Sequence, residues 1–180
     1  MVDTRTLATA SLFGVIIAVV QGPILPPPTG DLLIAVEALL LGLGYILLGF
    51  GGATYTAGIA GALINLVEPG FWLFPLLLAL LYGVQTDVFS LLFRVVHQGK
   101  VSSKRLVVAL TLSSATTGPI AYYTTVAAGL VPSSPVGFYA FLIVFGVISG
   151  AIGAFVAAKL WDRTLRVRFR PKQPGVTETN

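Results

Sequence analysis

The distribution of basic residues is the feature that most constrains this chain. No Lys or Arg occurs between Arg5 and Arg94, and the other basic residues fall at 94–105 and at 159–172. An average soluble domain has roughly a quarter of its residues charged. Here only 10% are charged and the mean hydropathy is +0.91. A water-soluble globular protein is therefore excluded, and we expect lipid to cover most of the surface.

Length and hydropathy together predict an all-α integral membrane protein, a six-transmembrane-helix bundle. About 20 residues form one membrane-spanning helix, so 180 residues accommodate six spans with short connections. Pro and Gly, which end helices, interrupt the apolar sequence between these spans. We expect residues 1–162 to form one transmembrane domain and residues 163–180 a basic cytoplasmic tail. The predicted spans are 6–21, 31–48, 53–67, 71–96, 106–130 and 137–161.

The basic residues also predict the orientation, because Lys and Arg are enriched in cytoplasmic loops. If Arg5 is cytoplasmic, six spans place the 94–105 loop and the tail on the same side. The predicted protein is thus multi-pass in the cell membrane, with both termini in the cytoplasm. Clustering of this kind also argues against a nucleic-acid partner. One alternative stays open: residues 7–20 could be the apolar core of a cleaved signal peptide, which would leave five spans.

Small residues recur at four-residue spacing on the first predicted span, at Ala10, Gly14 and Ala18. Small residues allow the close helix contacts on which association in membranes depends. The stripe therefore indicates either packing within the bundle or a docking surface for another membrane protein.

Polar and aromatic residues from all six predicted spans fall in one layer near the outer side. A polar group facing lipid costs several kcal/mol, and a few polar groups on an apolar wall are typical of a small-molecule site. Glu37 has no basic residue near it in the sequence, so it is protonated, solvated in a cavity, or facing a cationic ligand. For Trp72 and Tyr139 an interfacial aromatic belt is the alternative. The predicted substrate-binding residues are Gln21, Glu37, Asn65, Glu68, Trp72, Tyr122, Tyr123 and Tyr139.

Signatures of enzymes and metal sites are missing from the sequence. There is no Cys and only one His, and no nucleotide-binding P-loop, His-Glu-x2-His or Gly-x-Ser-x-Gly motif. We expect no enzymatic activity, cofactor or metal site. Gln85 and Asp87 lie too deep for the outer layer; for Asp87 we favour a structural hydrogen bond over contact with a partner protein or an ion. His97 is expected at the level of solvent or lipid headgroups.

The six spans, the Ala10-x3-Gly14-x3-Ala18 stripe, the Pro-rich first outer loop and the Gly-rich last span (146–153) resemble the substrate-binding S components of energy-coupling-factor vitamin transporters. The resemblance implies capture of a vitamin-like molecule from outside, with residues 22–30 as a lid. It further implies docking through the stripe on a membrane coupling protein that two ATPase subunits drive.

Two other functions stay open from the sequence. An ion-coupled carrier or small channel would use Glu37 and Asp87 as intramembrane acids, and a structural subunit of a membrane complex would need no ligand. For a binding protein, the two outer acids and the aromatic residues suggest a cationic or pyrimidine-like ligand.

Overall fold

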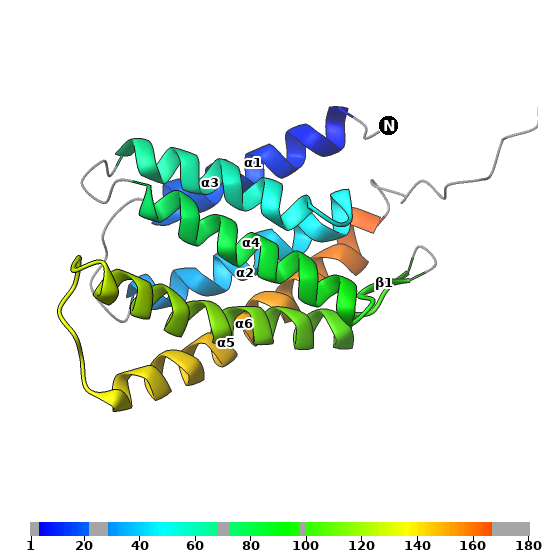
Figure 1. Ribbon diagram of the computed structural model, residues 1–180. Coiled ribbons are helices and arrows are strands. Elements are labelled where there is room, and N and C mark those ends of the chain that lie inside the picture. The colour runs from blue at the N-terminus through cyan, green and yellow to red at the C-terminus, as the bar shows by residue number, and fades with distance from the viewer. Residues whose placement is uncertain (1–3, 22–28, 68–72, 98–99, 167–180) are drawn as a thin grey trace, which may run out of the picture.

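The computed structural model describes residues 4–21, 29–67, 73–97 and 100–166 (Figure 1). In this part of the chain six long helices account for the fold, together with one short hairpin and a final π-helical turn. The predicted all-helical class is therefore confirmed. The elements are α1 (Thr4–Gln21), α2 (Thr29–Leu48), α3 (Gly52–Val67), α4 (Phe74–Leu92), β1 (Val96–His97), β2 (Lys100–Val101), α5 (Ser103–Ala127), α6 (Val136–Leu160) and η2 (Trp161–Leu165).

The helices begin and end within four residues of the predicted segments, and local backbone chemistry explains several of their ends. Gly49 and Gly51, with φ of 79° and 89°, make the turn between α2 and α3. Glycine enters this left-handed region without steric cost, unlike other residues. Gly129, with φ of 73°, follows α5 in the same way, and Pro75 lies in the first turn of α4, where it is tolerated.

The segment between α4 and α5 differs from the prediction. The fourth apolar segment was expected to continue to residue 96, but α4 ends at Leu92 and Arg94 takes a left-handed φ of 50°. The chain then forms an antiparallel hairpin in which Val96 pairs with Val101 and His97 with Lys100. His97 is exposed on this hairpin. Two-residue strands lack a periodic pattern long enough to be read from sequence.

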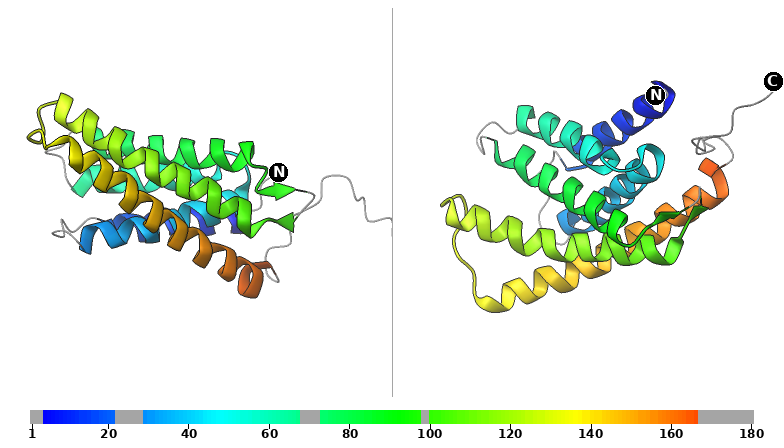
Figure 2. Two further views of the ribbon diagram at one scale, coloured as in Figure 1. Left: turned by 90° about the horizontal axis from the view of Figure 1, so that it is seen from below. Right: turned by 45° about the vertical axis from the view of Figure 1, so that its right-hand side comes forward.

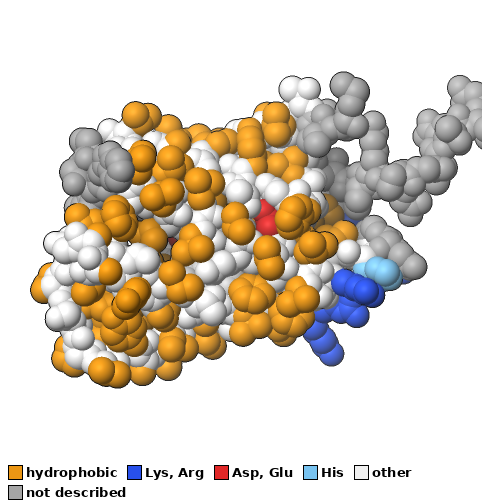
Figure 3. All heavy atoms as spheres, in the orientation of Figure 1, with side chains coloured by type: hydrophobic (Ala, Val, Ile, Leu, Met, Phe, Trp, Pro, Cys, Tyr) orange, Lys and Arg blue, Asp and Glu red, His pale blue; other side chains and the backbone are white. Residues whose placement is uncertain are grey.

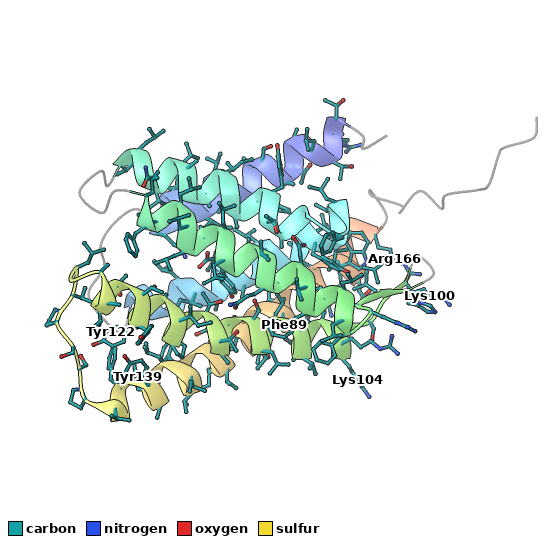
Figure 4. The ribbon with its side chains drawn as sticks, viewed as in Figure 1. Phe89, Lys100, Lys104, Tyr122, Tyr139 and Arg166 are labelled. Atoms are coloured by element: carbon teal, nitrogen blue, oxygen red, sulfur yellow. The ribbon has the colours of Figure 1, made fainter. Side chains whose placement is uncertain are left out.

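The helices run alternately between two ends of the bundle, and the basic residues gather at one of them. The start of α1, the hairpin and the end of α6 lie at this basic end in all views (Figures 1 and 2). Lys100, Lys104 and Arg166 mark it, whereas Tyr122 and Tyr139 lie at the opposite end (Figure 4). The three segments that were assigned to the cytoplasmic side, because Lys and Arg are enriched there, therefore lie at the same end of the bundle.

The outer surface of the helices is apolar. Val19 on α1, Leu77 on α4 and Phe155 on α6 are 69%, 53% and 63% exposed, and hydrophobic side chains are spread over the visible face of the bundle (Figure 3). Three helices of the described residues are long and apolar enough to cross a membrane: Thr4–Gln21, Phe74–Leu92 and Val136–Leu165. Apolar side chains outside and polar ones inside indicate a membrane protein. The buried polar residues are Glu37, Thr56, Thr86, Asp87, Ser90, Ser113, Ser114 and Ser149.

Glycines bring neighbouring helices into close contact. A Cβ on Gly14 of α1 would lie 2.7 Å from the carbonyl oxygen of Thr56 on α3, and a Cβ on Gly146 of α6 would lie 2.6 Å from that of Ser114 on α5. Ala10, Gly14 and Ala18 are all buried. In this structure the predicted docking stripe is an internal packing surface, because its glycine lies against α3.

The carboxylate of Asp87 on α4 caps the first turn of α3. Its Oδ1 accepts a hydrogen bond from the N–H of Ala53 at 3.1 Å. Its Oδ2 accepts bonds from the N–H of Thr54 at 2.9 Å and from the Thr54 hydroxyl at 2.6 Å. The first N–H groups of a helix lack partners within it, and the helix dipole favours a negative charge there. The structural hydrogen bond predicted for Asp87 is confirmed.

We expect Asp87→Ala to destabilise the bundle, because it removes the only charged acceptor that the described residues offer to these buried N–H groups. The loss should be about 2–3 kcal/mol in the free energy of unfolding, with Asp87→Asn intermediate. Unfolding of the purified protein in detergent would measure it. Asp162→Ala, which removes an exposed carboxylate, is the control. Equal stability of Asp87→Ala and this control would contradict the capping role.

Gly83→Ala should also destabilise the protein, because the new Cβ would lie 2.7 Å from Thr54 Cα on α3. Overpacking of this kind costs about 1–3 kcal/mol. Gly137→Ala is the matched control, since no atom lies within 4 Å of its Cβ position. The same unfolding measurement should show a lower stability for Gly83→Ala alone; a neutral Gly83→Ala would argue against the close α3–α4 contact.

Candidate functional site

A cavity of about 290 Å³ lies inside the bundle and takes residues from all six helices. Several of these residues lie near helix ends that face away from the basic end: Gln21 is the last residue of α1, and Pro75 is the second of α4. The cavity is therefore displaced toward the end opposite the basic one. Its lining consists of Gln21, Ile34, Glu37, Ile64, Pro75, Leu78, Ala79, Tyr82, Ser114, Thr117, Gly118, Ala121, Leu142, Phe145 and Gly146.

The only charged residue in this lining is Glu37, which lies about 12 Å along α2 from Thr29 at 1.5 Å per residue. Its Oε2 accepts a hydrogen bond of 2.5 Å from Nε2 of Gln21. Glu37 is buried and Gln21 is half-buried. The structure thus brings together two of the residues predicted to bind substrate, and it places an acidic group in a largely apolar cavity.

Hydroxyl groups from α4 and α5 supply further polar atoms. The hydroxyls of Tyr82 and Ser114 are hydrogen-bonded to each other at 2.5 Å. The Thr117 hydroxyl has two acceptors within hydrogen-bond distance for its one hydrogen, Oε1 of Gln85 at 2.8 Å and the carbonyl oxygen of Ser113 at 2.8 Å. Tyr82, Ser114 and Thr117 therefore join Glu37 and Gln21 as the polar lining of the cavity.

Sequence reasoning missed these three hydroxyl residues, although a signal for them exists. On α4, Tyr82, Thr86 and Ser90 follow one another at four-residue spacing, and the hydroxyl of Thr86 bonds to that of Ser113 on α5 at 3.0 Å. Residues at this spacing share a helix face. A hydroxyl-rich face on each of two apolar helices indicates that the faces meet, since lipid offers no hydrogen-bond partners.

The predicted tyrosines lie at the end of α5 and the start of α6, outside the cavity lining. The ring of Tyr122 packs edge-on against Phe138 and Tyr139, with centroids 4.9 and 5.3 Å apart. Its hydroxyl donates to the carbonyl oxygen of Pro132 at 3.1 Å, and Tyr123 is 64% exposed. Figure 4 shows Tyr122 and Tyr139 side by side at this end. For Tyr139 this position is consistent with the interfacial aromatic belt that was the alternative to substrate binding.

The aromatic residues continue along α6 toward the cavity. Phe138 stacks on Phe141 with centroids 5.9 Å apart, and Phe141 contacts Phe145 at 5.5 Å. Phe145 lines the cavity. It adds an aromatic ring to the lining, whereas the sequence prediction had expected this contribution from other residues.

Of the remaining predicted residues, the structure describes only Asn65, which is not among the lining residues. Asn65 lies near the end of α3, and its buried Oδ1 has no hydrogen-bond partner among the described residues. Glu68 and Trp72 lie outside the described residues, as do residues 22–28 of the expected lid. Within the described part of the chain, no group of three His, Cys, Asp or Glu side chains could hold a metal ion.

Comparisons of the chain with family models, with curated proteins and with solved structures find no match. The interpretation of the cavity therefore depends on its own chemistry. An apolar wall with one carboxylate, one amide and three hydroxyl groups can hold a small molecule and orient it through a few polar contacts.

Proposed function

We propose that the chain is a multi-pass protein of the cell membrane whose six helices cross the bilayer, with the basic end in the cytoplasm. The apolar outer surface and the three long apolar helices support this placement. The gathering of Lys and Arg at one end supports the orientation, because such residues are enriched on the cytoplasmic side. In this orientation the cavity lies toward the outer side of the membrane.

We further propose that the protein captures a small vitamin-like molecule from outside in this cavity, as a substrate-binding subunit for uptake. The observation that carries the proposal is a cavity built by all six helices around the buried Glu37. A carboxylate is kept at membrane depth at a cost of several kcal/mol, and such residues mark substrate or ion sites. Glu37 would accept a hydrogen bond or pair with a positive charge on the ligand.

The size of the cavity limits the ligand. At about 290 Å³ it lies near the lower end of the roughly 300–1,000 Å³ that is typical of ligand pockets. This fits a molecule with one or two small rings. The ring of Phe145 suits a flat heteroaromatic group, and the hydroxyls of Tyr82 and Thr117 suit its ring nitrogens or amino groups. A cationic or pyrimidine-like ligand therefore remains our proposed class.

Uptake would need an energy source, and we propose a membrane coupling protein with two ATPase subunits as partners. The internal position of Ala10, Gly14 and Ala18 means that such a partner would have to contact other residues in this conformation. The competing function, an ion-coupled carrier, would use Glu37 and Asp87 as intramembrane acids. It is less well supported, because Asp87 is engaged in capping α3 and does not line the cavity.

Glu37→Gln should weaken binding of a cationic heteroaromatic probe such as thiamine by about tenfold to a hundredfold, the range for a charge-assisted hydrogen bond. Calorimetric titration of the purified protein in detergent would measure the change. Asp162→Asn, which neutralises an exposed carboxylate outside the cavity, should bind like the parent protein. Binding that both variants retain would exclude Glu37 as the ligand contact. Ion-driven flux in proteoliposomes without any partner would instead support a carrier.

Ala121→Leu tests the cavity without changing any charge, because Ala121 lines it and a larger side chain would occupy part of its volume. We expect binding of the same probe to weaken at least tenfold while the protein still folds. Ala127→Leu, at the exposed end of the same helix, is the control. Equal affinities for the two variants would show that the probe binds elsewhere.

A further inference from the structure

A second hollow lies at the basic end of the molecule, between the start of α5 and the end of α6. Its volume is about 480 Å³, and it is separate from the central cavity, with which it shares no lining residue. Lys104, which marks the basic end in Figure 4, belongs to it. We call it the basic groove. Its lining consists of Ser103, Lys104, Val107, Phe155, Ala158, Lys159, Asp162 and Arg163.

The charges of the basic groove favour an anion. Three basic residues line it, Lys104 on α5, Lys159 on α6 and Arg163 on η2, together with one acidic residue, Asp162, so positive charge is in excess. The groove also includes Ser103, the first residue of α5, where no side chain caps the helix. A helix N-terminus carries a partial positive charge and unpaired N–H groups, which adds to the attraction of the three basic side chains.

One wall of the basic groove is apolar and exposed. Phe155 on α6 is 63% exposed, and the half-buried Val107 on α5 also lines the groove. Nζ of Lys159 lies 6.0 Å from the centroid of the Phe155 ring, so charge and apolar surface meet at this point. The neighbouring Leu160 is 40% exposed. A free inorganic anion would use only the charged half of such a groove.

We propose that the basic groove binds one anionic phospholipid. Its phosphate is held by Lys104, Lys159 and Arg163, and the start of an acyl chain lies on Phe155 and Val107. Basic pockets between transmembrane helices on the cytoplasmic side are known to hold acidic lipid headgroups. This inference goes beyond substrate capture, and it depends only on the placement of the chain in a membrane.

The test is native mass spectrometry of the full-length protein with phosphatidylglycerol or phosphatidylcholine of identical acyl chains. We expect one phosphatidylglycerol to stay bound, with at least tenfold preference over phosphatidylcholine. The triple variant Lys104→Gln, Lys159→Gln, Arg163→Gln should lose this preference. A control variant removes the same charge from the same end outside the groove: Arg94→Gln, Lys100→Gln, Arg166→Gln. It should bind as the parent does.

Three results would overturn the proposal. Equal loss in both triple variants would show that a diffuse basic surface attracts the lipid. Full displacement by millimolar inorganic phosphate, with no effect of Phe155→Ser, would indicate a site for small anions. No preference for phosphatidylglycerol in the parent would show that the groove takes something else, such as an acidic segment of a protein. If the triple variant fails to fold, the single variants Lys159→Gln, inside the groove, and Lys100→Gln, outside it, give the same comparison. Thiamine binding in the central cavity is measured separately, so that failure of the lipid proposal and failure of the proposed function can be told apart.

Discussion

An apolar exterior forces the polar side chains of this bundle to find partners inside it, and the rest of the structure depends on that constraint. Val19, Leu77 and Phe155 face outward, so the hydroxyls of α4 and α5 bond to each other and Asp87 bonds to the first turn of α3. These bonds hold helices that no hydrophobic force would bring together within lipid. Glycines complete the contacts by letting backbones approach closely.

The central cavity lies where polar side chains of neighbouring helices do not fill the space between the helices. The hydrogen-bonded pairs Glu37–Gln21 and Tyr82–Ser114 both line it, together with apolar residues such as Phe145. Polar side chains of the same helix faces that stabilise the bundle through hydrogen bonds therefore also line the central cavity. The basic groove has the opposite character, because its charged side chains lie at the basic end of the bundle. In the proposed placement, lipid headgroups and water surround this end.

Much of the fold could be predicted from the sequence, because Gly and Pro interrupt long apolar segments and their backbone preferences determine where helices end. Asp87 was also predicted correctly, since a buried carboxylate without a basic neighbour needs hydrogen-bond donors. The hairpin at 96–101 was missed, because two residues in each strand carry no pattern. The stripe of Ala10, Gly14 and Ala18 was ambiguous, since internal packing and docking select the same small residues.

The lining of the central cavity was predicted only in part. Depth in the membrane pointed to Gln21 and Glu37, and they do meet. Depth alone cannot say which way a side chain points around its helix, so Tyr122 and Tyr123 were included although they lie outside the cavity lining, whereas Tyr82 was overlooked. Residues at one level of a bundle face either lipid, a neighbouring helix or a cavity, and only the packing of all six helices decides among them.

The central claim is an internal cavity that opens to the outside of the cell, and cysteine accessibility tests it most directly because the chain contains no Cys. Three single variants would be treated, in intact cells, with a membrane-impermeant cationic thiol reagent. They are Ala121→Cys in the cavity, Leu77→Cys on the apolar surface and Lys100→Cys at the basic end. The account predicts that only Ala121→Cys reacts, and that Lys100→Cys reacts once the membrane is permeabilised. An Ala121→Cys variant that stays unreactive from outside, or a Lys100→Cys variant that reacts there, would contradict it.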